Sequence, residues 1–296
     1  MKELAFDFTQ PAGEPALTGP DSVSWQVFKN PIGLFVGGIT AVILELAEAR
    51  VRSGVWNHST FRTDPLERME RTGLAAMVTV YGARSAAERM IAGIGRIHDR
   101  VKGMTPDGRA YHAGDPELLG WVHATAAFGF LEAYATFVRP LDRADRDRFY
   151  AEGAAAARLY GATGAPTSQA ELEAQLAAMQ PKLERSEIVF EFLEILRATR
   201  ILPRPLRGLQ HVLIRAAIDI TPAAARETLG LDARFGLRRG ERALVRALGR
   251  LADRVPIPGA PVALASRRLG LPATHVYRRA ARTRGGDAER VPAVAG

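Results

Sequence analysis

Apolar residues recur along most of the chain at intervals of three and four, the pattern of one buried helix face. No segment of useful length alternates apolar and polar residues as a strand does. The sequence therefore predicts an all-α fold, a single large helical bundle of roughly ten helices. The predicted helices cover residues 31–53, 65–81, 85–101, 116–137, 143–160, 168–179, 184–200, 205–218, 222–229 and 238–253, with two short helices within 264–280.

The helix predicted over 31–53 is apolar on nearly every side of its first half, so we expect it at the centre of the bundle. Gly33, Gly37 and Gly38 would let a neighbouring helix or a flat ligand approach its backbone, and helix packing is the more frequent cause. Residues 55–62, which follow this helix, are predicted to form a loop.

The helical pattern predicts one domain over residues 25–280. Residues 1–24 are rich in proline, glycine and threonine, and we expect them to form an extended arm. The small and polar residues 281–296 are predicted to be a disordered tail.

The chain of 296 residues contains no cysteine, which excludes disulfides, thiolate nucleophiles, iron–sulfur clusters and a thiolate-ligated haem. The Glu-x-x-His pairs of di-iron bundles, the His-Glu-x-x-His motif of zincins and the Gly-x-Ser-x-Gly motif of hydrolases are all absent. A metal in this protein would have to be held by histidine, carboxylate, tyrosine, methionine or backbone oxygen.

The net charge of +8 comes almost entirely from arginine, a bias that coding composition most often explains. Its alternative explanation is contact with nucleic acid or with an anionic membrane surface. We rank nucleic-acid binding last, because no helix-turn-helix with a basic recognition helix is present. Residues 1–7 lack the apolar core of a signal peptide, and the longest uncharged apolar stretch, 31–44, is shorter than the roughly 20 residues that span a bilayer. These features predict a cytoplasmic protein and leave peripheral membrane contact open.

Three of the six histidines are candidates for chemistry. His98 lies at the edge of an apolar helix stripe, where an imidazole can be a metal ligand, a general base or a core residue. His123 lies within a more fully apolar stripe and needs a hydrogen-bond partner or a metal there. His58, between Trp56 and Phe61, is predicted to lie in a loop, where it is either functional or a local capping residue.

Two further sets of side chains suggest a polar site. Arg68 and Thr72 are four residues apart and share one helix face, so they could together bind a propionate, polarise dioxygen or orient a carbonyl group. Their alternative is a surface network of arginine and glutamate side chains. Glu45 and Glu48, on the predicted central helix, are candidate bases unless an arginine partner explains them.

These segments together resemble, in order, the latex-clearing-protein (rubber oxygenase) and MpaB family, whose domain is also called DUF2236. The resemblance covers residues 25–165 with ordered motifs, and less closely the helices up to about 250. The segments that carry it are Asn30-Pro31, Leu44-Glu45-Leu46-Ala47-Glu48-Ala49-Arg50-Val51, His58-Ser59-Thr60-Phe61-Arg62-Thr63-Asp64-Pro65-Leu66-Glu67-Arg68, Arg71-Thr72, Ile97-His98-Asp99-Arg100-Val101-Lys102-Gly103, Tyr111, Asp115-Pro116-Glu117-Leu118-Leu119 and Trp121-Val122-His123-Ala124-Thr125.

The resemblance implies an oxidoreductase, an oxygenase with a haem b inside the bundle. By position, His98 matches the proximal iron ligand, with His123 as the second choice. Arg68 and Thr72 match the distal arginine and threonine, and Arg71 falls where rubber oxygenases have a lysine.

The resemblance also bears on the substrate. The secreted rubber oxygenases have an export signal that we do not find here, so we expect an apolar small molecule, such as a lipid or terpenoid, together with dioxygen. The alternative is a helical ligand-binding protein of the same fold without haem. The sequence does not indicate an oligomeric state.

Overall fold

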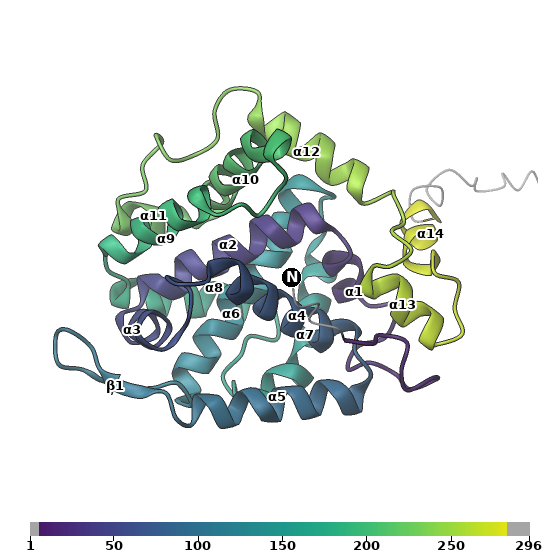
Figure 1. Cartoon of the computed structure of the whole chain (residues 1–296), viewed down its shortest axis with the longest axis horizontal. Coiled ribbons are helices and arrows are strands. Elements are labelled where there is room, and N and C mark those ends of the chain that lie inside the picture. The colour runs from purple at the N-terminus through teal and green to yellow at the C-terminus, as the bar shows by residue number, and fades with distance from the viewer. Residues whose placement is uncertain (1–5, 283–296) are drawn as a thin grey trace, which may run out of the picture.

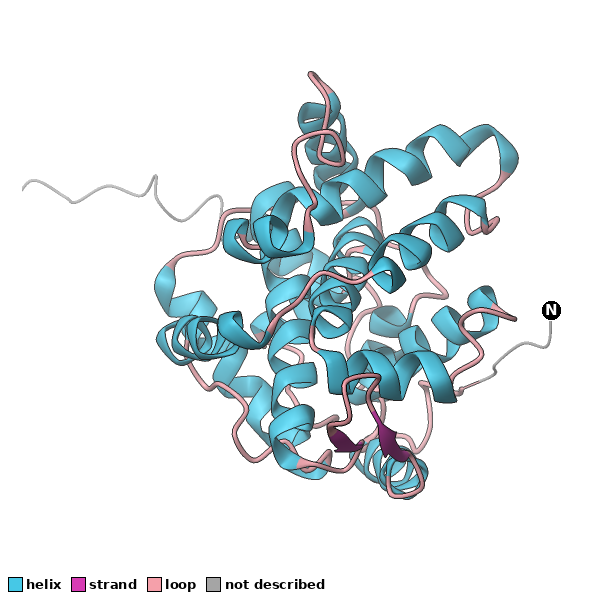
Figure 2. Cartoon of the chain, turned by 90° about the vertical axis from the view of Figure 1, so that its left-hand side faces the viewer, coloured by secondary structure: helices cyan, strands magenta, loops and turns pink. Residues whose placement is uncertain are grey.

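The computed structural model describes residues 6–282, and fourteen α-helices with one two-stranded sheet make up its regular structure apart from two short 3-10 turns (Figures 1 and 2). The predicted all-α fold is confirmed. The predicted tail, 281–296, lies almost entirely outside the described residues. The helices are α1 Val23–Phe28, α2 Pro31–Ala47, α3 Ala49–His58, α4 Pro65–Tyr81, α5 Arg84–His98, α6 Pro116–Phe137, α7 Arg143–Leu159, α8 Gln169–Met179, α9 Glu187–Ala198, α10 Arg207–Ile220, α11 Ala223–Leu229, α12 Glu241–Ala252, α13 Pro261–Arg268 and α14 His275–Arg282, and the strands are β1 Lys102–Met104 and β2 Ala110–His112.

Short polar side chains cap the helices that form the candidate site. The Asp64 carboxylate accepts a hydrogen bond from the Glu67 amide at 3.1 Å and starts α4. Asp115 accepts from the Glu117 amide at 2.8 Å and starts α6 in the same way. Proline occupies the first position of both helices, where its missing amide hydrogen costs nothing.

The single helix predicted over 31–53 is wrong, because the chain breaks at Glu48. This residue is extended, with φ −93° and ψ 125°, and ends α2. Its carboxylate then accepts a hydrogen bond from the Val51 amide at 2.8 Å and caps α3. The apolar period continues through the break, so the hydrophobic pattern alone does not reveal it.

Three further segments differ from the prediction. Residues 55–58 belong to α3 rather than to a loop, and α5 ends at His98 rather than at Val101. Residues 102–112 form a short antiparallel hairpin in which Lys102 pairs with His112, although no strand was predicted. The hairpin projects from the edge of the bundle (Figure 1).

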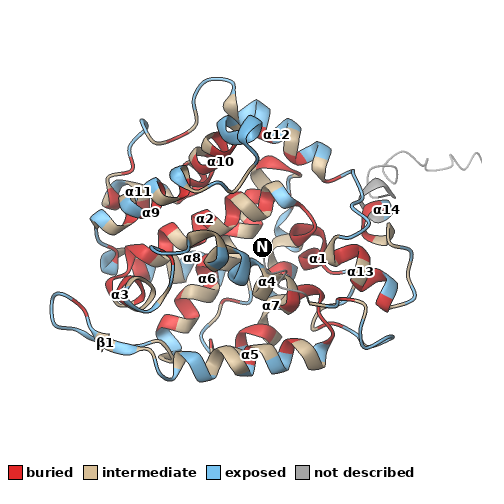
Figure 3. Cartoon of the chain, in the orientation of Figure 1, coloured by how far each residue is buried: buried red, intermediate tan, exposed pale blue. Residues whose placement is uncertain are grey.

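The centre of the bundle is the crossing of α2 and α6, and buried residues gather along α2 (Figure 3). A Cβ atom at Gly37 would lie 2.6 Å from the Gly129 carbonyl oxygen, and one at Gly129 would overlap the Gly37 carbonyl oxygen. The two backbones are therefore in direct contact, which confirms helix packing as the reason for Gly37.

Buried polar contacts connect the N-terminal end of α2 to α12. The Lys29 ammonium lies 2.6 Å from an Asp253 carboxylate oxygen, and the Asn30 amide donates to the Gly249 carbonyl at 2.9 Å. The N-terminal segment, residues 6–22, packs against α13, where the Gly13 amide donates to the Arg268 carbonyl at 2.8 Å. No helix among residues 6–282 has the length and apolarity needed to cross a membrane.

We expect Gly129→Ala to lower the free energy of unfolding by about 3 kcal/mol, because its methyl group meets backbone on α2 that cannot move aside. Urea unfolding followed by circular dichroism measures the change. Gly73→Ala on α4 is the matched control, since nothing lies within 4 Å of its added Cβ, and it should instead raise stability by roughly 0.5–1 kcal/mol. Equal effects of the two substitutions would contradict the close crossing.

Candidate functional site

Glu45 lies in the last turn of α2 and is half-buried between the helices. Burial raises its pKa to about 7, against the opposing effects of the Arg68 charge and of a hydrogen bond with the Thr125 side chain. A carboxyl group with this pKa can both accept and release a proton near neutral pH.

The glycine crossing determines which residue faces Glu45. The helices run antiparallel there, since Gly33 lies beside Tyr134 and Gly37 beside Gly129, and the end of α2 that holds Glu45 therefore lies against the part of α6 that holds Thr125. Glu45 and Thr125 therefore lie in the same α2–α6 interface as the glycines that let the two helices approach closely.

Arg68 extends from the first turn of α4 toward the same carboxyl group. Burial lowers its pKa, while the negative charge of Glu45 raises it and the nearby charge of Arg71 lowers it. Its guanidinium forms no hydrogen bond or ion pair with any residue between 6 and 282. A desolvated cation without a direct partner is costly, so this position favours binding of an anionic or strongly polar group.

His98, the last residue of α5, lies near enough to Arg68 for the charge of that arginine to act on it. Burial lowers its pKa; the Asp99 carboxylate raises it, and the charges of Arg68 and His112 lower it. The imidazole is therefore mostly neutral at pH 7, the form that binds a metal. One turn earlier, Gly95 is half-buried, yet nothing lies within 4 Å of an added Cβ, so space is open beside this end of α5.

The predicted arginine–threonine face of α4 is only partly turned inward. Arg71 and Thr72 are exposed, whereas Arg68 is half-buried. The Thr72 hydroxyl donates to the Arg68 carbonyl at 2.8 Å, one turn back along the helix. The structure thus brings Arg68 together with Glu45 and His98, and places Arg71 and Thr72 at the outer edge of this group.

His123 points to the other side of α6. Its Nε2 atom lies 3.4 Å from the position of a Cβ at Gly153 on α7. Burial lowers its pKa to about 4, although solvent reaches part of the ring. Thr125 is two residues further along the helix, so the two side chains point in nearly opposite directions.

The other two predicted site residues have structural partners. Glu48 is fully buried, caps α3 and accepts a hydrogen bond from the Arg50 Nε at 2.8 Å. This is the arginine-paired alternative that the sequence left open. His58 is exposed at the end of α3, with its Nε2 3.0 Å from the Tyr111 hydroxyl of the hairpin.

Thr125 and Asp99 are the neighbours that sequence reasoning did not single out. Thr125 was recognisable as a polar residue four positions before Gly129 on the face that meets α2. Asp99 lies beside His98 just past the end of α5, where its charge acts on the imidazole. Among residues 6–282 no three His, Asp or Glu side chains converge in a way that could hold a metal ion by themselves.

The raised pKa of Glu45 makes stability depend on pH. Between its ordinary value of 4.5 and about 7 the folded protein keeps a proton that the unfolded chain has released, so stability falls as pH rises through this interval. We expect Glu45→Gln to abolish this slope and to gain about 2 kcal/mol relative to the parent between about pH 5 and pH 8.

Urea unfolding of both proteins across this pH range measures the effect. Glu88→Gln, at an exposed position on α5, should leave the pH dependence of the parent unchanged. Parallel pH curves for the parent and Glu45→Gln would show that Glu45 is ionised throughout.

Comparison with known proteins gives one match. The family described as "ER-bound oxygenase mpaB/B'/Rubber oxygenase, catalytic domain" matches residues 25–254. No curated protein and no solved structure matches the chain. The matched segment contains Glu45, Arg68, His98 and His123, and it extends beyond the ordered motifs to α12. The match supports an oxygenase type of oxidoreductase, and the chain belongs to the mpaB/rubber oxygenase family.

Proposed function

We propose that the protein is a haem b-dependent oxygenase that oxidises or cleaves an apolar small molecule such as a lipid or terpenoid. The observation that carries the proposal is the unpaired, half-buried guanidinium of Arg68, which shares one interior region with the Glu45 carboxyl group and the neutral His98 imidazole. This combination provides a metal ligand, a fixed positive charge and a proton acceptor close together.

The donor set fits a haem better than a bare metal ion. A haem iron needs only one or two protein ligands, because the porphyrin supplies the others, and a neutral imidazole is a common one. His98 and His123 both have lowered pKa values. Neither imidazole forms a hydrogen bond to a described residue. Haem held by one of these imidazoles would supply the chemistry of dioxygen activation.

Two observations favour His98 over His123 as the ligand. His98 lies close enough to Arg68 for that charge to lower its pKa, and Arg68 in turn acts on Glu45. His123 faces α7, away from the Thr125 side of α6. A single pocket that uses the whole polar group would therefore contain His98.

The remaining residues would bind and orient the reactants. The Arg68 guanidinium is placed to hold a propionate or to stabilise negative charge that develops on an oxygen atom, with Arg71 adding positive charge from the edge. The Glu45 carboxyl group would take up or return a proton, since its pKa is about 7. The Thr125 side chain, whose hydroxyl donates to the Val122 carbonyl at 2.9 Å, lies beside this carboxyl group.

The helices that carry the candidate site are rich in apolar side chains. Met77 on α4, Met90 on α5 and Phe128 on α6 are partly buried and pack against the core. A substrate bound among these helices would find few hydrogen-bond partners, which supports a lipid or terpenoid rather than a sugar or nucleotide.

We expect the purified protein to show a Soret band and the His98→Ala variant to lose it, with haem occupancy falling at least about tenfold because the iron loses its protein ligand. His123→Ala is the matched control and should retain haem. Ultraviolet–visible spectra and haem extraction measure both, and thermal unfolding checks that each variant is folded.

The opposite pattern, in which His123→Ala loses haem and His98→Ala retains it, would move the ligand to α6. A folded parent protein that is colourless and takes up no added haemin would overturn the oxygenase proposal. It would leave the alternative of a haem-free ligand-binding protein of the same fold.

A further inference from the structure

Exposed apolar side chains gather on the outer side of α12 and on the segment that follows it. Eight large hydrophobic residues are exposed among the described residues, and four of them lie between residues 244 and 257. Leu251 is 60% exposed, and Val255 and Ile257 are each about half exposed. Exposed apolar groups clustered in this way mark a surface that binds something.

The contacts of α12 with the bundle show which of its faces is turned outward. Val245 and Gly249 are buried, and a Cβ at Gly249 would lie 2.7 Å from the Phe137 carbonyl oxygen at the end of α6. The helix is therefore held tightly against the bundle. Leu244, Ala247 and Leu251 follow each other at intervals of three and four on the opposite face.

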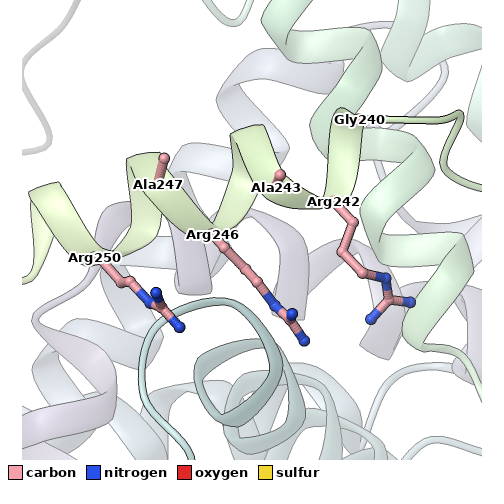
Figure 4. Close-up of a pocket in the computed structure, with 6 residues that line it drawn as sticks. All are labelled: Gly240, Arg242, Ala243, Arg246, Ala247 and Arg250. Atoms are coloured by element: carbon pink, nitrogen blue, oxygen red, sulfur yellow. The ribbon is translucent and has the colours of Figure 1, made fainter.

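A row of arginines runs beside this apolar stripe. Arg242, Arg246 and Arg250 are four residues apart and extend to the same side of α12 (Figure 4). They line an open hollow of about 490 Å³. Arg242 pairs with Asp219, and the Arg246 Nε donates to the Thr136 carbonyl at 3.1 Å. Arg250 is exposed and has no ion-pair partner in the described part of the chain.

The local charge is strongly positive. Six arginines lie between residues 238 and 258, against two carboxylates. Both carboxylates are already paired with residues of the bundle. Glu241 pairs with Arg215 on α10, and Asp253 is buried beside Lys29. The outward surface of this segment therefore presents leucine, valine, isoleucine and arginine without an exposed carboxylate.

We propose that the outer face of α12 with the segment 253–258 docks onto an anionic phospholipid membrane. A helix that lies in the plane of a membrane buries apolar side chains among the acyl chains, while its basic side chains meet the lipid phosphates. The stripe Leu244, Ala247 and Leu251 supplies the first contact. The exposed arginines Arg250 and Arg254 beside it supply the second.

Other occupants fit this surface less well. Nucleic acid would neutralise the arginines, but its backbone offers no apolar surface for the two leucines. A second copy of the chain would bring one arginine row against another, and like charges in a self-complementary interface repel. This surface lies away from the proposed haem site. Asn30, which contacts α12, and Glu45 lie at opposite ends of α2, roughly 20 Å apart.

Vesicle flotation of the full chain tests the proposal. We expect binding to vesicles that contain phosphatidylglycerol and much weaker binding to phosphatidylcholine alone, with affinity falling as salt rises. The double substitution Arg250→Glu and Arg254→Glu should lower the partition coefficient at least about tenfold. Leu244→Ser with Leu251→Ser should lower it about tenfold without changing the net charge.

The matched control is Arg143→Glu with Arg158→Glu, which makes the same charge change at exposed positions on α7. This variant should bind vesicles nearly as the parent does, and circular dichroism checks that all variants are folded. Equal losses in the control and the Arg250/Arg254 variant would overturn the proposal. Binding that depends on the arginines but not on the leucines, and that RNA competes for, would identify a nucleic-acid surface instead and would also overturn it.

Discussion

The contact between the backbones of α2 and α6 is the constraint on which the rest of the molecule depends. Gly37 and Gly129 allow an approach that any side chain would prevent. A close crossing excludes water and fixes the relative register of the two helices. Register in turn determines which residues one and two turns away face each other. The pairing of Glu45 with Thr125 follows from this crossing, and so does the burial that raises the pKa of Glu45.

The polar group around Glu45 has an electrostatic arrangement that a purely structural network lacks. Lys29 and Arg215 show the usual arrangement of a buried or half-buried charge, since each meets a carboxylate directly, Asp253 and Glu241 respectively. Arg68 instead acts on Glu45 without an ion pair, and the nearby His98 is kept neutral. A guanidinium held in this state is most stable when a bound group supplies the missing negative charge. This is the physical basis for the proposal that the site binds a haem and dioxygen.

The two ends of the α2–α6 pair serve different purposes. At one end Glu45 and Thr125 belong to the candidate site. At the other end Asn30 and Phe137 hold α12 by its inner face. Because α12 is anchored through Val245 and Gly249, its outer leucines and arginines can bind a surface without loosening the core. The same packing that builds the site thus presents the proposed membrane face.

The sequence by itself determined the helical class, most helix positions and the family, because apolar spacing, capping residues such as Asp64 and ordered motifs are local properties of the chain. It also indicated Glu45, Arg68 and His98 as candidates. It did not reveal the break at Glu48, where a carboxylate caps the next helix without interrupting the apolar period. Only the tertiary structure separated Glu45 from Glu48, Arg68 from Thr72 and His98 from His123. Burial, pairing and pKa depend on residues distant in sequence, and helix packing alone brings those residues together.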